Sequence, residues 1–123
     1  MSFDWLEYLN LAQELAGQAT KPSSQEAKLR SAVSRAYYAA FCKARNHLRG
    51  EGHSIPRLKR HRYVIDQFLD SPDRVSRRIG AHLDRLRKDR NKADYDDRVV
   101  RLSDMTRKAL KLADHAIIGV GNL

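Results

Sequence analysis

The chain has 123 residues, 41% of them hydrophobic, which is enough for one domain with one core and too few for a comfortable division into two. Its 24 Lys and Arg residues outnumber 15 Asp and Glu residues, so the formal net charge is +9 and the surface attracts polyanions. The single cysteine, Cys42, excludes an intramolecular disulfide, and no apolar stretch approaches the ~18 residues of a membrane span. We therefore expect one cytoplasmic domain over residues 1–123, outside the membrane.

Apolar residues recur at three- and four-residue steps along the chain, which predicts helices and no strand. The first predicted helix covers residues 3–20, and Gly17 is expected to weaken its last turn without ending it. The second begins at a capping box formed by Ser23 and Glu26 and continues to about residue 48. Two glycines and a proline in residues 50–56 then predict a mobile surface loop.

The third predicted helix is short and covers residues 59–69. The fourth follows at once, because Ser71 can cap it and Pro72 suits its first turn. This helix runs to about residue 93, with an apolar stripe on one side and mostly arginines on the others.

Asp96 or Asp97 is expected to cap a last helix that reaches about residue 120. The connections are short, so consecutive helices should lie side by side and mostly antiparallel. The expected fold class is therefore all-α, an up-and-down bundle of four to five helices.

The basic excess is concentrated in two segments. Residues 43–62 hold seven basic residues and one acid, and residues 74–92 hold eight basic residues and two acids, so each segment carries +6. Arg outnumbers Lys in both, and a guanidinium makes forked, two-point contacts with phosphate oxygens. This pattern favours nucleic acid as a partner. A solvated basic face is the alternative.

The most informative stretch is Arg90-Asn91-Lys92-Ala93-Asp94-Tyr95, at the predicted junction of the last two helices. Four-residue steps place Arg87, Asn91 and Tyr95 on one helical stripe, and Arg90 and Asp94 on the next. We expect Arg90 to bind phosphate, Asn91 to orient a phosphate or sugar, and Tyr95 to donate its hydroxyl. In the structural alternative, Arg90 and Asp94 form a surface ion pair worth ~0.3–0.5 kcal/mol and Tyr95 closes the core.

A second cluster, Ser-Arg-Ala-Tyr-Tyr-Ala-Ala-Phe at residues 34–41, lies in the middle of the second helix. Core packing accounts for Tyr37, whereas Arg35 either is exposed or needs a polar partner such as Asp94 or Asp66. Cations around His61 oppose its protonation and keep it a neutral acceptor. The residues expected to bind nucleic acid or phosphate are therefore Arg35, His61, Arg87, Arg90 and Asp94.

The histidines lack metal-ligand spacing, so we expect neither a metal nor a cofactor.

The 34–41 cluster, the 61–68 segment and the 90–95 stretch, in this order, resemble the HEPN family across nearly the whole chain. The resemblance implies a four- or five-helix bundle that pairs as a homodimer. Many members are encoded beside a minimal nucleotidyltransferase as toxin–antitoxin couples, and many are metal-independent ribonucleases. The family's ribonuclease signature is an Arg, a polar residue, and a His five to seven positions after the Arg. Arg90 and Asn91 match it, but Tyr95 stands where the His is expected.

Because Tyr95 stands where the ribonuclease signature has a His, three hypotheses about function remain. A His with a pKa near 6.5 exchanges protons at neutral pH, whereas a Tyr near 10 is ionised at only about one part in a thousand at pH 7. The leading hypothesis is a binding or regulatory module that recognises RNA or a nucleotide-bearing partner. The rival is an endoribonuclease toxin that uses Arg90, Asn91 and Tyr95 as catalytic residues, with His61 or another histidine. The third is a non-catalytic subunit that binds a nucleotidyltransferase.

Overall fold

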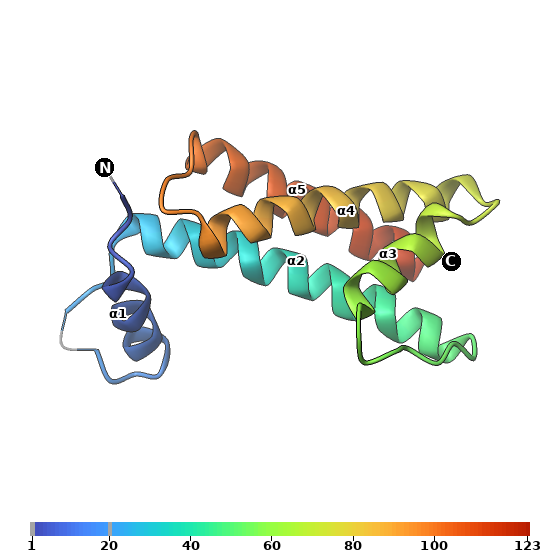
Figure 1. Ribbon diagram of the computed structural model, residues 1–123, viewed down its shortest axis with the longest axis horizontal. Helices are drawn as coiled ribbons and strands as arrows, with labels where there is room; N and C mark the ends of the chain where they lie inside the picture. The colour runs from blue at the N-terminus through green and yellow to red at the C-terminus, as the bar shows by residue number, and fades with distance from the viewer. Residues whose placement is uncertain (1, 20) are drawn as a thin grey trace.

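The computed structural model describes residues 2–19 and 21–123, and every regular element in this part of the chain is an α-helix. The predicted all-α bundle is confirmed. The helices, shown in Figure 1, are α1 (Leu6–Leu15), α2 (Gln25–Gly50), α3 (Arg60–Leu69), α4 (Arg74–Tyr95) and α5 (Leu102–Gly121). None of the described helices combines the length and apolarity needed to cross a bilayer.

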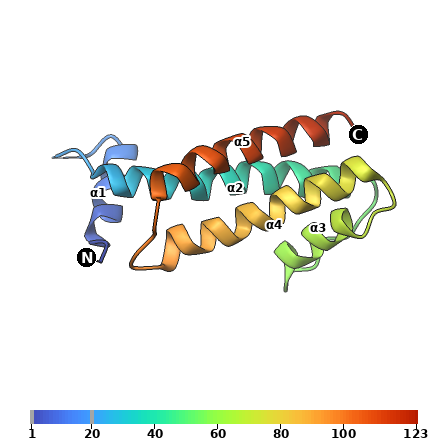
Figure 2. The ribbon, with the colours of Figure 1, turned by 90° about the horizontal axis from the view of Figure 1, so that it is seen from above.

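Helices α2, α4 and α5 form the body of the molecule, and α3 packs mainly against α4 (Figures 1 and 2). Alanines on facing sides of α2 and α5 let these two helices approach closely, while larger side chains from α3 and α4 fill the remaining space. The buried core includes Val33, Ala36, Tyr37, Ala40, Phe41, Ala44, Val64, Ile65, Phe68, Ile79, Leu83, Leu86, Ala109, Ala113 and Ala116. The predicted core position of Tyr37 is therefore confirmed.

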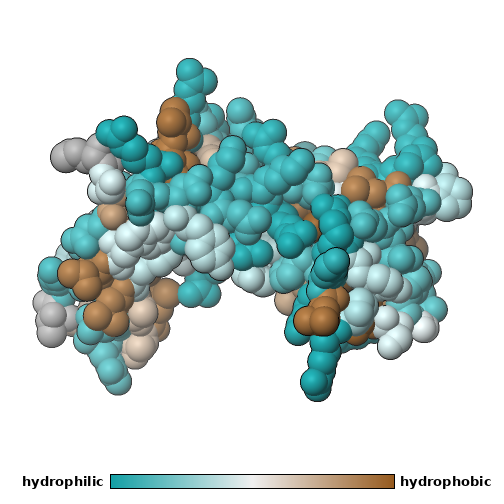
Figure 3. Space-filling model, viewed as in Figure 1, coloured by the Kyte–Doolittle hydropathy of each residue, from teal (hydrophilic) through white to brown (hydrophobic). Residues whose placement is uncertain are grey.

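Helix α1 projects from the bundle beside the start of α2 and has a small apolar cluster of its own (Figure 1). Phe3, Leu11 and Ala27 are buried there, whereas Leu9 and Leu15, predicted to face inward, are 55% and 59% exposed. Figure 3 shows apolar patches on this lobe and a hollow between it and the lobe that contains α3. The prediction failed because α1 packs along only a short part of α2 instead of lying on the main core.

Gly17 ends α1 well before the predicted boundary. Its φ of +74° lies in the left-handed region. Its N–H donates to the Glu14 carbonyl at 3.1 Å, and the Gln18 N–H donates to the Gln13 carbonyl at 2.8 Å. This pair of bonds is a Schellman closure. The expectation that Gly17 only weakens the last turn was therefore wrong, and the predicted end at Thr20 lies outside the described residues.

Ser24, and not Ser23, caps α2. The Ser24 hydroxyl accepts from the Ala27 N–H at 3.2 Å. Glu14 of α1 accepts from both the N–H and the hydroxyl of Ser23, so Ser23 anchors α1 and is unavailable as a cap. The predicted capping box fails because Glu26 then falls one position too early to close it.

Asp73 caps α4, two residues after the predicted cap. Its carboxylate accepts from both the N–H and the hydroxyl of Ser76 at 3.0 Å. Ser71 instead accepts from the Asp73 N–H at 3.1 Å, so Ser71 and Pro72 lie in the turn before the helix. Asp73 makes the stronger cap because its charge also interacts with the helix dipole.

Helix α5 begins later than predicted, at Leu102. Arg101 precedes it with φ 55°, and no side chain caps the helix. The predicted caps, Asp96 and Asp97, lie in the α4–α5 link, where their backbone carbonyls accept hydrogen bonds from Arg30. The Asp97 carboxylate instead accepts from Trp5 Nε1 at 2.8 Å.

Helices α3 and α4 cross most closely at Gly80. A Cβ at this position would lie 2.7 Å from the Leu69 backbone nitrogen and 2.9 Å from Leu69 Cγ. Only glycine fits this contact without a shift of α3. The crossing fixes α3 on α4 and so places His61, in the first turn of α3, over the middle of α2.

Candidate phosphate-binding site

Arg90 points from α4 toward α2 and is only 7% exposed. Its guanidinium carbon lies 5.3 Å from the ring centre of Tyr37 and 5.2 Å from that of Tyr38, within cation–π range. The Asp94 carboxylate, one turn later, is 3.9 Å from Arg90 Nη1, which is too far for a hydrogen bond. Arg90 Nε is buried and has no hydrogen-bond partner in the described chain. Aromatic rings, rather than a carboxylate, therefore hold this cation.

His61 completes the aromatic surface beside Arg90. Its ring stacks on Phe41 with centroids 4.4 Å apart and meets Tyr38 edge-on at 5.9 Å. Its Nδ1 lies 2.6 Å from the hydroxyl oxygen of Tyr37. Folding thus brings His61 and Arg90 to the same tyrosine pair, although they are far apart in sequence.

The protonation of this cluster follows from its burial and charge. Burial, followed by the nearby cations Arg87, Arg90 and Arg60, lowers the pKa of His61 to about 4, so the ring is neutral at physiological pH. Burial also raises the pKa of Tyr37, which keeps its hydroxyl protonated. In the tautomer with its proton on Nε2, His61 accepts from the Tyr37 hydroxyl at Nδ1 and keeps Nε2 as a free donor. The neutral His61 agrees with the prediction, but its Nδ1 is already occupied.

The arginines around His61 differ in how their charges are balanced. Arg62 forms ion pairs with Asp66 and Asp84. Arg87, which is half-buried, forms no ion pair with any described residue, and its Nε is buried without a partner. We call Arg87, Arg90, His61 and Tyr38 the phosphate cluster. It presents two poorly neutralised guanidinium groups and an N–H donor beside an aromatic ring.

The other predicted site residues lie outside this cluster. Positions 90 and 95 are about 140° apart around an α-helix, and Tyr95 is 72% exposed at the end of α4. Asn91 is also exposed, and no contact joins Arg90 to either residue within the described chain. Tyr95 therefore does not close the core, contrary to the structural alternative. Arg35 is exposed, and its Nε donates to the Ser31 hydroxyl at 3.3 Å.

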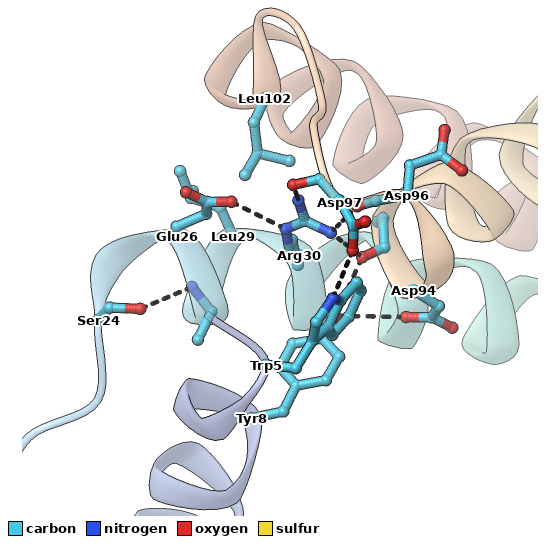
Figure 4. Close-up of polar contacts among 12 residues, drawn as sticks. Trp5, Tyr8, Ser24, Glu26, Leu29, Arg30, Asp94, Asp96, Asp97 and Leu102 are labelled. Carbon is cyan, nitrogen blue, oxygen red and sulfur yellow. Dashed lines mark hydrogen bonds and ion pairs between the residues drawn. The ribbon is translucent and has the colours of Figure 1, made fainter. Parts of the chain in front are cut away.

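Arg30 is a buried cation that the sequence reasoning missed. It is fully buried, and its guanidinium donates to the carbonyls of Ala93 at 3.0 Å, Asp96 at 2.6 Å and Asp97 at 3.2 Å. Its Nε donates to Glu26 at 3.1 Å (Figure 4). These bonds satisfy carbonyls that α4 leaves free at its C-terminal end. Arg30 therefore fixes the helix end that carries the 90–95 stretch.

The N-terminal segment covers the other side of Arg30. The ring centres of Phe3 and Trp5 lie 4.3 Å and 5.0 Å from its guanidinium carbon. Trp5 Nε1 donates to the Asp97 carboxylate at 2.8 Å (Figure 4). The Phe3 N–H donates to the Asp97 carbonyl at 2.8 Å. Arg30 lies three residues before Val33, on the apolar stripe of α2. A cation on this buried stripe was the sequence signal that could have identified Arg30.

Asp94 receives hydrogen bonds from α1 and α2. Tyr8 lies with its hydroxyl oxygen 3.5 Å from Asp94 Oδ1 and 3.2 Å from the Ala93 carbonyl (Figure 4). Ser34 donates to Asp94 Oδ2 at 3.1 Å. Burial, followed by the Asp94 charge, raises the pKa of Tyr8 to about 12, so the hydroxyl keeps its proton and acts as a donor. Each oxygen of this carboxylate therefore faces a hydroxyl from another helix, and Ser34 makes the closer contact.

Comparison with known proteins connects this arrangement to a family. The model of the HEPN domain matches residues 7–118, which run from α1 to near the end of α5. Neither the curated proteins nor the solved structures gave a match. The matched region contains the whole phosphate cluster, Arg30 and Asp94. Because the family model covers most of its length, the chain belongs to the HEPN domain family.

Proposed function

We propose that this protein is an RNA- or nucleotide-binding HEPN module and that the phosphate cluster is its binding site. The observation that carries the proposal is the state of Arg87 and Arg90. Arg90 is buried, Arg87 is half-buried, and the Nε atom of each is buried without a partner; neither forms a hydrogen-bonded ion pair with a described carboxylate. Leaving buried cations without close partners is costly, and a bound phosphate would supply the missing acceptors.

Each part of the cluster has a role in this proposal. Arg90, held between tyrosines at the base, and Arg87, at the rim, donate to phosphate oxygens together with His61 Nε2. The Tyr38 side chain, 39% exposed, offers a face on which a base can stack. Arg35 adds charge along α2, while Asn91 and Tyr95 are placed to contact more distant parts of a longer RNA.

The hydrogen bond between Tyr37 and His61 favours binding over cleavage. A general base needs a free lone pair on a group that titrates near neutral pH. His61 Nδ1 is occupied by Tyr37, and burial with three nearby cations lowers its pKa to about 4. Tyr95 provides no substitute, because a phenol keeps its proton at neutral pH.

A metal-independent endoribonuclease toxin is the second candidate. Its support is that folding brings His61 into the same cluster as Arg90. In that reaction Arg90 would stabilise negative charge on the phosphorus, and His61 would transfer protons after releasing Tyr37.

A binding titration in the absence of divalent metal tests the proposal. We expect the affinity for a short, labelled single-stranded RNA to fall as salt rises, because phosphate contacts release counterions. Arg90→Gln should weaken binding about ten-fold. The matched control is Arg78→Gln, which removes the same charge from an exposed position on α4 and should weaken binding only about two-fold. Equal losses in the two variants would refute a specific site.

Gel electrophoresis of the same RNA samples separates binding from cleavage. Intact RNA supports a binding module, whereas fragments that disappear with both Arg90→Gln and His61→Gln support the ribonuclease. A wild-type protein that binds no RNA would leave the third hypothesis, a non-catalytic subunit that binds its partner protein.

The assembly proposed for this function is a homodimer that pairs with a minimal nucleotidyltransferase in a toxin–antitoxin system. Two copies would place the basic 43–62 and 74–92 segments on both sides of a shared cleft, which doubles the charge that faces the RNA. Sedimentation analysis of the purified protein tests this arrangement. A monomer at working concentration would contradict it.

A further inference from the structure

We infer that Tyr8 and Ser34 hold the Asp94 carboxylate out of hydrogen-bond range of Arg90 and thereby keep Arg90 available to a phosphate. This inference rests on the proposed phosphate site and assigns positioning roles to two residues outside it. Asp94 Oδ2 is 3.9 Å from Arg90 Nη1, whereas a charge-assisted hydrogen bond between such groups is about 2.7–2.9 Å long. The carboxylate therefore stops about one ångström short of a close ion pair.

The geometry of α4 alone would bring this pair together. Arg90 and Asp94 are four residues apart, the spacing at which opposite charges form ion pairs on a helix. Three such pairs on described helices have closer contacts: Arg62–Asp66 at 2.9 Å, Arg85–Asp89 at 3.2 Å, and Lys88–Asp84 at 3.2 Å. Arg90 and Asp94 depart from this pattern although both side chains are largely buried, where the attraction is stronger.

The two hydroxyl donors explain the departure. Ser34 donates to Oδ2 from α2 at 3.1 Å. The Tyr8 hydroxyl, whose shorter contact is with the Ala93 carbonyl at 3.2 Å, lies 3.5 Å from Oδ1, so each carboxylate oxygen faces a hydroxyl from another helix. Both donors are neutral and satisfy Asp94 without cancelling the charge of Arg90. Asp94 still lowers the cost of burying Arg90 through its Coulomb attraction, but it leaves the guanidinium hydrogens to another acceptor. A closer carboxylate would compete with phosphate for the same donors.

The test removes the two hydroxyls and then the carboxylate charge. In Tyr8→Phe/Ser34→Ala, we expect Asp94 to move onto Arg90 and the affinity for the short RNA to fall about five-fold. Adding Asp94→Asn should restore binding to at least the wild-type affinity, because the competing charge is gone. A purely structural role for the hydroxyls predicts no such rescue, since the third substitution removes a further contact.

The outcomes also separate this inference from the proposed function. If Arg90→Gln binds RNA as the wild type does, the phosphate site itself is wrong. If Arg90→Gln weakens binding while the double variant keeps wild-type affinity, only the positioning role is overturned. The positioning role is also overturned if adding Asp94→Asn to the double variant fails to restore binding. Thermal unfolding checks that each variant is folded. If the double variant does not fold, Ser34→Ala alone takes its place, with an expected loss of RNA affinity of about two-fold.

Discussion

Replacing Arg30 with Met removes the buried cation that links α2, the N-terminal segment and the end of α4. Met fills much of the same volume but donates no hydrogen bond. The substitution leaves the carbonyls of Ala93, Asp96 and Asp97 without their shared donor and removes the cation from between Phe3 and Trp5. We therefore expect both global destabilisation and loosening of the N-terminal segment.

The magnitude follows from the bonds that are lost. A hydrogen bond that involves a charged group contributes about 1.5–3 kcal/mol, and breaking a buried charged network by removing one partner costs about 3–5 kcal/mol. Two of the three carbonyl bonds are only partly buried, so water can replace some of the loss. We expect the free energy of unfolding to fall by about 3 kcal/mol, which corresponds to about 10 °C in Tm for a chain of this size.

Urea unfolding followed by circular dichroism gives the free energy, and Trp5 fluorescence reports the local change because the chain has one tryptophan. Arg35→Met is the matched control: it lies on the same helix, is exposed, and bonds only to Ser31, so its effect should stay within about 0.5 kcal/mol. If Arg30→Met is within about 1 kcal/mol of wild type and Trp5 emission is unchanged, the Arg30 network does not hold this end of the fold.

Two further expectations concern α3. Gly80→Ala should lower the free energy of unfolding by about 2 kcal/mol, because its Cβ would press on the Leu69 backbone; Gly50→Ala, in open space, is the control, and equal thermal stability of the two variants would contradict the close crossing. His61 has a pKa of about 4 in the folded protein, so the unfolded chain binds more protons between about pH 6.5 and pH 4. Its contribution to stability is full above that window and is lost as pH falls through it. Urea unfolding at several pH values should show a shallower acid decline for His61→Gln, and identical slopes would count against the burial of a neutral His61.

The sequence predicted the helices well because their signal is local. The apolar period of α2 identified Tyr37 as core, and the basic surroundings of His61 correctly indicated a neutral ring. The positions of Arg90 and Tyr95 could also have been predicted, because five residues rotate a helix by about 140° and cannot place both side chains in one pocket.

Two of the failures share a physical cause: a tertiary partner took a group that local rules assigned elsewhere. Ser23 bonds to Glu14 of α1, so the cap of α2 moved to Ser24. The Asp97 carboxylate accepts from Trp5 Nε1, so it does not serve as the predicted cap of α5. No local pattern specifies these partners, because each is contributed by a distant segment.

The most direct test of the phosphate cluster is the NMR signal of the arginine guanidinium groups. In protein labelled on arginine nitrogen and titrated with the short RNA, we expect the signals of Arg87 and Arg90 to shift and become protected from solvent exchange. Arg30 and Arg62, whose Nε atoms already donate to Glu26 and Asp66, should stay unchanged. RNA that saturates the protein without moving the Arg87 and Arg90 signals would contradict the site.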